Sequence, residues 1–313
     1  MKSTPKIGRA SEAAGPARRG SLRQDRRLYL WFLAPMVILL FGLTIYPVLY
    51  GINTSFTNLN LARPHIETSY VGFDNYVAMY QSNSFRRVVQ NTVLFVGGAV
   101  AAQFVVGFGL ALLLNRQLPA RGLIRTLLLL PLMVTPVVAA LVWSLFYNPS
   151  SGIINQGLMA LGVRSPPIWL GDPSIALISI IIADTWQWAP FIMLLMLAGL
   201  QTIPKDFYEA AQIDGATGWA SFRYITVPVL MPLIGVVLLF RIMDAFKVFE
   251  KIYILTGGGP GLATETIIFH AYRQGFGFWN MGYASAIAVL AFIMVLVATL
   301  VIIRSTHGES VTE

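Results

Sequence analysis

The sequence contains no cysteine and only three histidines among its 313 residues. Without cysteine the chain cannot form disulfides, zinc–thiolate sites, iron–sulfur clusters or a thiol nucleophile. The three histidines, His65, His270 and His307, lie far apart in the sequence, and no His-Glu-x-x-His segment is present. Metal chemistry is therefore not expected.

Charged residues are also scarce, at 12% of the chain against 56% hydrophobic residues and a mean hydropathy of +0.67. Because a soluble domain carries about a quarter charged residues, a lipid bilayer is the expected surrounding. The net charge of +8 does not indicate a nucleic-acid partner, since eight of the 22 basic residues lie in the tail 1–27, directly before the first apolar run. Basic residues in that place are typical of a cytoplasmic membrane flank.

Six apolar runs are long enough to cross a bilayer, which takes about 20 mostly apolar residues per helix. Segments rich in Gly, Pro, Asn and Ser separate them. The first run is longer than the apolar part of a signal peptide, and no small-residue cleavage pattern follows it, so an uncleaved span is expected. The sequence thus predicts an all-α polytopic membrane protein with six transmembrane helices, at 28–50, 88–114, 127–147, 175–200, 226–246 and 281–303.

Lys and Arg are distributed unevenly between alternate loops, with 14 on the side of the amino-terminal tail and seven on the other. By the positive-inside rule, both termini are expected in the cytoplasm. The predicted order begins with a basic cytoplasmic tail (1–27) and a first span with its outward loop (28–87). A membrane core (88–303) follows, with the cytoplasmic loop 201–228 inside it, and a second cytoplasmic tail (304–313) ends the chain. Two more segments, 148–173 and 247–280, are expected to face outward.

The loop 201–228, between the fourth and fifth predicted spans, has the pattern of a helix, a turn and a second helix. Pro204 suits the first position of a helix, Asp206 suits the positive end of its dipole, and Gly215 can end it. A second short helical segment is expected at 219–224. With its apolar side chains, such a loop forms a small knob that fits the groove of another protein.

Within this loop, Glu209-Ala210-Ala211 is followed at fixed spacing by Gly215, Ile225 and Val227-Pro228. The pattern resembles the cytoplasmic EAA loop of permease subunits of type I bacterial ABC importers, with Val227 in place of the usual leucine. The resemblance implies that the loop is the coupling helix that docks on an ATPase subunit. The residues to which it assigns this role are Glu209, Ala210, Ala211, Asp214, Gly215, Ile225 and Pro228.

Other stretches resemble the maltose-type and glycerol-phosphate-type sugar permeases. They are 240–260 with Thr264-Glu265-Thr266, then Trp186, Pro190 and Phe191 in the fourth run, and 72–76 in the first outward loop. The similarity covers most of the chain after the basic tail. Residues 51–87 are too few for the large outward domain of the maltose system itself. The resemblance implies import of a carbohydrate or carbohydrate derivative through the bacterial inner membrane.

The resemblance also implies a set of partners: a second homologous permease subunit, two ABC ATPase subunits and an extracytoplasmic solute-binding protein. The chain has no Walker motif, and its glycine-rich segment 257–260 lacks the Gly-Lys-Ser/Thr ending of a phosphate loop. ATP and Mg are therefore expected at the partner ATPases, and this chain is expected to bind no cofactor and to catalyse no reaction. The segment 257–260 is expected to form a tight turn, followed by a surface helix near 264–273.

Three charged residues, Asp184, Arg241 and Asp244, lie inside predicted spans, where an unpaired charge costs about 3 kcal/mol or more. Arg241 and Asp244 are three residues apart, so they share a helix face and are close enough to pair. One interpretation is a functional pair in a wet cavity. The other is a structural pair near the outer interface, with Arg241 snorkelling to water.

Asp184, Trp188 and Phe191 share one face of the fourth predicted helix. An acceptor beside aromatic rings suits a sugar, whose C–H faces stack while its hydroxyls need hydrogen-bond partners. Resemblance to the maltose-type permease places substrate-pathway residues at these three positions and at Arg241, Asp244, Ala245 and Val248. The alternative is that Trp188 and Phe191 only pack or lie in an interfacial aromatic belt.

Two other classes of protein are considered. A carrier driven by an ion gradient is expected to show an inverted repeat and a relay of membrane carboxylates, and neither is evident. An intramembrane enzyme needs a nucleophile with its base, or a metal set, on facing spans. None of the histidines lies in a predicted span.

Overall fold

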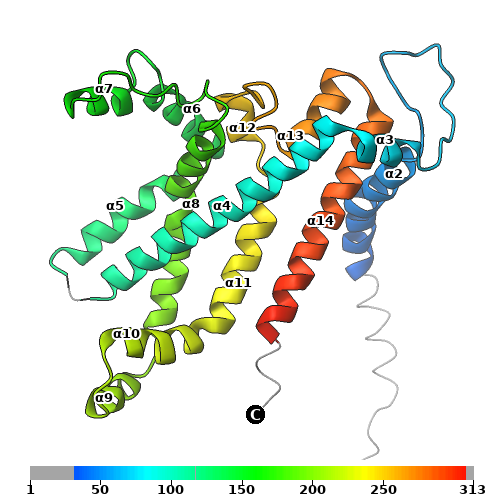
Figure 1. Cartoon of the computed structure of the whole chain (residues 1–313). Helices are drawn as coiled ribbons and strands as arrows, with labels where there is room; N and C mark the ends of the chain where they lie inside the picture. Colours follow the sequence, from blue (N-terminus) through cyan, green and yellow to red (C-terminus); the bar gives the residue numbers. More distant parts are fainter. Residues whose placement is uncertain (1–31, 117, 308–313) are drawn as a thin grey trace, which may run out of the picture. The chain divides into compact units, whose positions relative to one another are not determined.

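The computed structural model describes residues 32–116 and 118–307, with side chains up to 304 (Figure 1). Within these ranges the chain is helical, and its only β pairing is an isolated antiparallel bridge between Thr57 and Tyr70. The chain divides into two compact units, residues 1–50 and 51–313. The predicted basic tail 1–27 and the end 308–313 lie outside the described residues.

The boundary between the units falls within an apolar helix. This helix runs from Phe32 to Thr54, with π geometry at η1 (Phe41–Ile45) followed by α2 (Tyr46–Thr54). Its apolar side chains are exposed from Phe32 to Tyr50. It covers most of the first predicted span, whose start at Leu28 lies outside the described residues.

Four further long helices in the second unit match predicted spans. They are α4 (Asn83–Leu114), α8 (Ala176–Leu200), α11 (Val227–Ala245) and α14 (Met281–His307). In the part of the chain that the structure describes, five helices are long and apolar enough to cross a membrane, and one bent pair counts as a sixth. The prediction of six spans is therefore confirmed, with one of them broken.

The broken span is the third, which the sequence predicted as one helix at 127–147. The chain instead forms α5 (Arg121–Met133) and α6 (Pro136–Phe146), bent by 100°. Pro136 keeps the preceding Thr135 extended (ψ 148°), because its ring disfavours helical geometry in the residue before it. The free carbonyl of Val134 accepts a hydrogen bond from Gln187 Nε2 at 2.7 Å, so the break leaves this backbone group satisfied inside the bundle.

Short helices connect the long ones. They are α3 (Asp74–Gln81), α7 (Ile153–Ala160), α12 (Glu250–Leu255), α13 (Ile267–Tyr272) and the π turn η3 (Arg273–Gly277). The predicted turn at 257–260 is confirmed, with left-handed backbone at Gly257 (φ 57°) and Gly258 (φ 87°). The predicted surface helix near 264–273 is helical but not on the surface. Ile267, Phe269 and His270 are buried, because α13 packs against α4 and α14.

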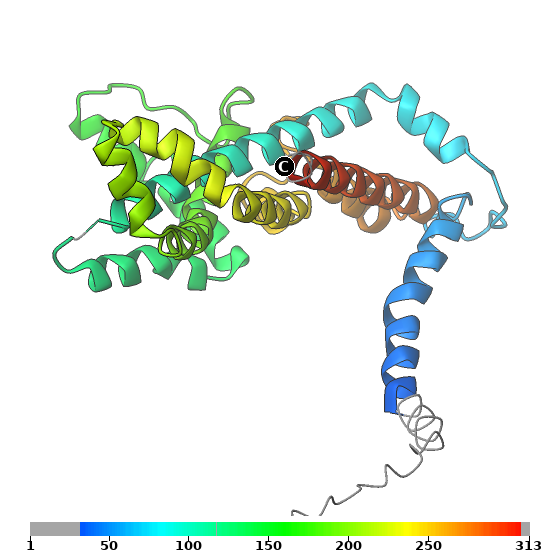
Figure 2. The same ribbon diagram turned by 90° about the horizontal axis from the view of Figure 1, so that it is seen from below.

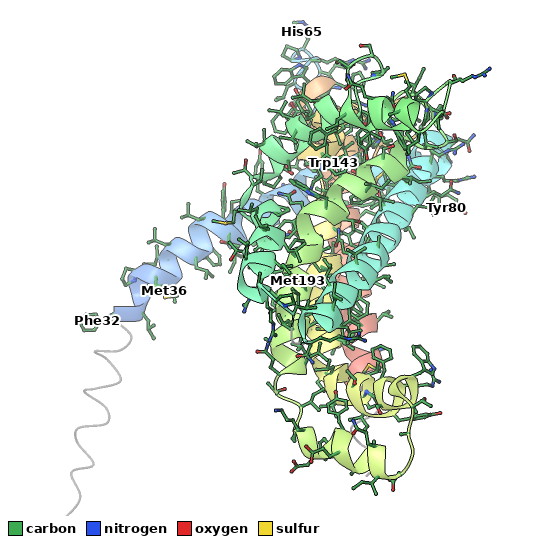
Figure 3. All side chains as sticks on the ribbon, turned by 90° about the vertical axis from the view of Figure 1, so that its left-hand side faces the viewer. Phe32, Met36, His65, Tyr80, Trp143 and Met193 are labelled. Carbon is green, nitrogen blue, oxygen red and sulfur yellow. The ribbon has the colours of Figure 1, made fainter. Side chains whose placement is uncertain are left out.

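Two apolar clusters hold the second unit together along α8. Trp143 belongs to one and Met193 to the other, and the two side chains lie at different heights in the bundle (Figure 3). Between α4 and α8 the backbones approach closely at Gly107, where a Cβ atom would collide with Ala189 O and the Ile192 side chain. Small residues permit such close packing of membrane helices, which matters because lipid supplies no hydrophobic force between them.

The loop 201–228 lies at one end of the second unit. Figure 1 shows α9 (Lys205–Ile213) and α10 (Gly218–Ser221) at the same end as the carboxyl end of α14, and α7 and α12 at the opposite end. Figure 2 views the unit from the α9 end. Segments predicted to lie on one side of the membrane therefore gather at one end of the bundle.

Candidate functional site

A polar cavity of about 190 Å³ opens between α6, α8, α11 and the segment 244–251. Six of the seven predicted substrate-pathway residues line it. The complete lining is Pro136, Asp184, Trp188, Arg241, Asp244, Ala245, Lys247, Val248, Glu250 and Lys251. The sequence prediction therefore brings together residues from two helices that are about 60 positions apart in the chain.

Asp184 is the centre of a buried charge network. Its side chain is 5% exposed. Lys251 Nζ donates to Oδ1 at 2.5 Å, and Gln103 Nε2 donates to Oδ2 at 2.6 Å. Arg241 Nη2 lies 3.7 Å from the same Oδ2. Both carboxylate oxygens are thus engaged by protein groups, and two cations offset the cost of burying the charge.

Arg241 is the second hub. Its Nη1 donates to Asp244 Oδ2 at 2.7 Å, its Nε donates to Gln103 Oε1 at 2.9 Å, and its guanidinium lies 4.5 Å from the centroid of the Trp188 ring. The predicted pairing with Asp244 is therefore confirmed. The snorkelling interpretation is wrong, because Arg241 is only 2% exposed and its head group points into the bundle.

Trp188 and Phe191 have different surroundings. Trp188 lines the cavity, with the Arg241 guanidinium over its ring, where the two attract as a cation–π pair. The ring of Phe191 meets Trp188 edge to face at 6.4 Å between centroids. Phe191 does not line the cavity. It packs against the lower apolar cluster, which is the one that contains Met193 and is formed by α4, α8 and α11.

The sequence prediction missed two members of the network, Gln103 and Lys251. Gln103 is fully buried in α4, and a lone amide in an apolar run is the signal that marks it. Lys251 was counted as a basic residue of the outward segment, but its side chain is 3% exposed. It is buried because α12 packs against α6 and α8.

A second ionic cluster fixes the segment after the glycine turn. The fully buried Glu265 pairs with His270 Nδ1 at 2.5 Å and with Arg273 Nη2 at 2.8 Å. Thr92 Oγ1 accepts a hydrogen bond from Ile267 N at 2.9 Å. The two ion pairs hold the segment 265–273 to itself, and the Thr92–Ile267 hydrogen bond joins α13 to α4.

The loop 201–228 forms the predicted helix, turn and helix, with two differences. Pro204 precedes α9 with extended backbone (ψ 138°) instead of opening it, while Gly215 (φ 76°) ends it as predicted. The fifth helix begins before its predicted start at 226, because one helix runs continuously from Gly218 to Ala245, with Pro228 in the first turn of α11. The π turn η2 (Phe222–Thr226) lies directly before Pro228 and widens the helix where the proline lacks a backbone donor.

The residues assigned to coupling by resemblance lie together on this loop. Glu209, Ala210, Asp214, Gly215 and Pro228 are exposed, and Ala211 and Ile225 are half-buried. Ile213 beside them is 86% exposed and Phe207 is 51% exposed. The loop therefore presents apolar side chains beside the residues assigned to coupling.

The sequence of the chain places it in a known family. Residues 103–306 match the binding-protein-dependent transport system inner membrane components, and the chain belongs to this family. It is similar to the trehalose/maltose transport system permease protein MalF of Thermococcus litoralis, with 43% identity over 238 residues, 76% of this chain and 80% of that protein. It is also similar to the sulfoquinovosyl glycerol transport system permease protein SmoG of Agrobacterium fabrum, with 37% identity over 280 residues, 90% of each.

The fold is similar to that of a solved transporter. One chain of the bacterial alginate ABC transporter, in complex with alginate pentasaccharide-bound periplasmic protein, superposes with a TM-score of 0.77 at 28% identity. The match covers 91% of this chain and 96% of that one. The predicted type I ABC importer permease fold and the multi-pass inner-membrane location are confirmed, and the ion-gradient carrier is set aside.

Proposed function

We propose that this chain is one of two channel-forming subunits of an ATP-driven importer that moves a carbohydrate or carbohydrate derivative across the inner membrane. The observation that carries the proposal is a single continuous helix, Gly218–Ala245, which joins the exposed loop to the polar cavity. Its 28 residues span about 42 Å. A continuous helix of this length connects a protein docked at the loop to groups that face the transported solute.

The substrate class follows from the cavity and the relatives. The relatives named above are described as transporting trehalose or maltose and sulfoquinovosyl glycerol, and the structural neighbour imports alginate. Trp188 and the surrounding charged groups offer the mixture of an apolar face and hydrogen-bonding groups that sugars require. The exposed partners in the lining, Asp244 and Lys247, are the groups that a sugar hydroxyl reaches first.

The partners follow from the architecture of such importers. An extracytoplasmic solute-binding protein delivers the sugar to the end of the bundle that carries α7 and α12. Two ABC ATPase subunits, which bind ATP and Mg, grip the loops at the other end, one on this chain and one on a second homologous permease subunit. The chain itself is not an enzyme, and its helices alternate between outward and inward access as the ATPases close and open.

Co-purification tests this assembly. The chain, expressed from its native operon and isolated by a tag in mild detergent, is expected to bring down an ATPase and a sister permease. The preparation should hydrolyse ATP faster when sugar-loaded binding protein is added. Isolation of a chain that is stable alone, with no ATPase activity in the preparation, would contradict the proposal.

A further inference from the structure

The helix α9 touches the membrane helices mainly through one side chain. Tyr208 is half-buried and packs against the lower apolar cluster, which includes Phe108 and Leu114 of α4 and Leu200 of α8. Of the nine residues of α9, Tyr208 is the one that joins this cluster, and most of the others are exposed. Tyr208 is therefore the side chain through which α9 itself is anchored to the bundle.

The hydroxyl of Tyr208 reaches the base of the long helix. Tyr208 Oη lies 2.9 Å from Thr226 Oγ1, and Thr226 is 3% exposed at the end of the π turn η2. The Thr226 hydroxyl also donates to Ser221 O at 3.4 Å, which leaves the Tyr208 hydroxyl as the donor of the first bond. A hydrogen bond with a partly buried donor and a buried acceptor fixes geometry, because an unpaired group there is costly.

Beside this contact the packing is loose. An open cavity of about 840 Å³ is lined by Tyr208, Thr226 and parts of α4, α8 and α10, including Asn115, Leu200 and Trp219. With so much space on one side, α9 has few other contacts that would carry a displacement into the bundle. The Tyr208–Thr226 contact bridges the gap at the point where the π turn of the continuous helix ends.

We propose that Tyr208 is a positioning residue that transmits movement of α9 to the helix Gly218–Ala245 through its hydrogen bond to Thr226. This inference rests on the proposed function, since it assumes that a motor protein grips α9. The π turn supports it, because such turns are frequent at functional positions inside helices. Arg241 and Asp244 lie at the far end of the same helix and line the cavity. A displacement of the helix at Thr226 therefore also displaces residues of the cavity wall.

Conservative variants test the contact in the whole transporter, reconstituted in proteoliposomes with its ATPases, sister permease and binding protein. Tyr208→Phe and Thr226→Val each remove one hydroxyl, and Thr226→Ser keeps it. The readouts are the ATP hydrolysed per sugar imported and the amount of ATPase that co-purifies. We expect Tyr208→Phe and Thr226→Val each to raise the ratio about threefold to tenfold, with co-purification unchanged and Thr226→Ser behaving as wild type.

The double variant and a matched control make the outcome decisive. Because both single changes break the same bond, the double variant is expected to be no worse than either one. The matched control is Tyr80→Phe, a hydroxyl removed from a side chain that is 79% exposed (Figure 3), and it should leave the ratio unchanged. Wild-type coupling in Tyr208→Phe, additive effects in the double variant, or loss of bound ATPase would each overturn the inference.

Glu209→Lys, measured in parallel, separates this inference from the proposed function. If Glu209→Lys uncouples hydrolysis from uptake while Tyr208→Phe does not, the loop is the docking element and only the role of Tyr208 is wrong. If both variants are fully coupled, the loop assignment fails and the inference fails with it.

Discussion

Lys251 Nζ lies 2.5 Å from Asp184 Oδ1 inside the helix bundle, and both side chains are at most 5% exposed. This ion pair joins α12, which follows the end of α11, to the middle of α8. Because Arg241 also approaches Asp184, the carboxylate is the common counter-ion of two buried cations. Asp184 therefore lines the cavity wall while two buried cations and Gln103 hold its carboxylate.

The first prediction concerns this pair. Asp184→Ala leaves Lys251 and Arg241 without their shared carboxylate, and breaking a buried pair in this way costs about 3–5 kcal/mol. We expect a marked fall in the melting temperature of the detergent-solubilised complex, measured by intrinsic fluorescence. Asp184→Asn combined with Lys251→Met should recover part of the loss, because the uncompensated charge is removed as well. Equal stability of Asp184→Ala and wild type would show that the pair does not form.

The second prediction concerns Gln103, which bridges Asp184 and Arg241 through both ends of its amide. Gln103→Leu leaves two buried polar groups short of a partner, at about 1–3 kcal/mol for each group. We expect lower thermal stability and slower uptake. Gln156→Leu is the matched control for thermal stability, since Gln156 lies exposed on α7 and its side chain donates to Ser151 O at 3.3 Å. A loss of thermal stability in Gln156→Leu as large as that in Gln103→Leu would contradict the role of Gln103 as a bridge between Asp184 and Arg241.

The third prediction concerns the orientation of the chain. The absence of cysteine makes single-cysteine variants informative without further changes. Ile213→Cys (86% exposed) and Tyr80→Cys (79% exposed) lie at opposite predicted sides of the membrane. In spheroplasts, a membrane-impermeant maleimide should label position 80, and it should reach position 213 only after lysis. Labelling at 213 in intact spheroplasts would reverse the predicted topology.

Much of the fold could be predicted because the bilayer imposes long apolar helices, and α4, α8, α11 and α14 stand out by length and composition alone. The break at Pro136 could not be predicted from the sequence. Whether a span can break at a proline depends on which group satisfies the backbone carbonyl that the break leaves free, here Val134 O. The donor to this carbonyl is the side chain of Gln187, 53 positions away in the chain. Nothing local in the sequence identifies this partner.

The candidate site could likewise be predicted only in part from the sequence. Helical spacing placed Asp184 and Trp188 on one face, and Arg241 and Asp244 on another, and all four line the cavity. Spacing could not show that Lys251 is buried, because this depends on the packing of α12 against α6 and α8. Phe191 shares the face of Asp184 by spacing but lies far enough along α8 to join the lower apolar cluster instead.

The fourth prediction concerns the docking loop. Glu209 is exposed on α9, and Glu209→Lys reverses its charge without disturbing a contact in the lower apolar cluster. We expect the complex to keep its basal ATP hydrolysis while losing stimulation by sugar-loaded binding protein. An enzyme-coupled phosphate assay measures both rates on one preparation. Stimulation equal to that of wild type would exclude Glu209 from coupling.

The central claim is that ATP hydrolysis by partner subunits, acting through α9 and the helix Gly218–Ala245, drives sugar through the cavity. Uptake of a radiolabelled sugar into proteoliposomes that contain the complete complex tests it most directly. The account predicts uptake that requires ATP, Mg and loaded binding protein, and that falls to background with Glu209→Lys. Uptake at the wild-type rate without the ATPase subunits, or in the Glu209→Lys complex, would contradict it.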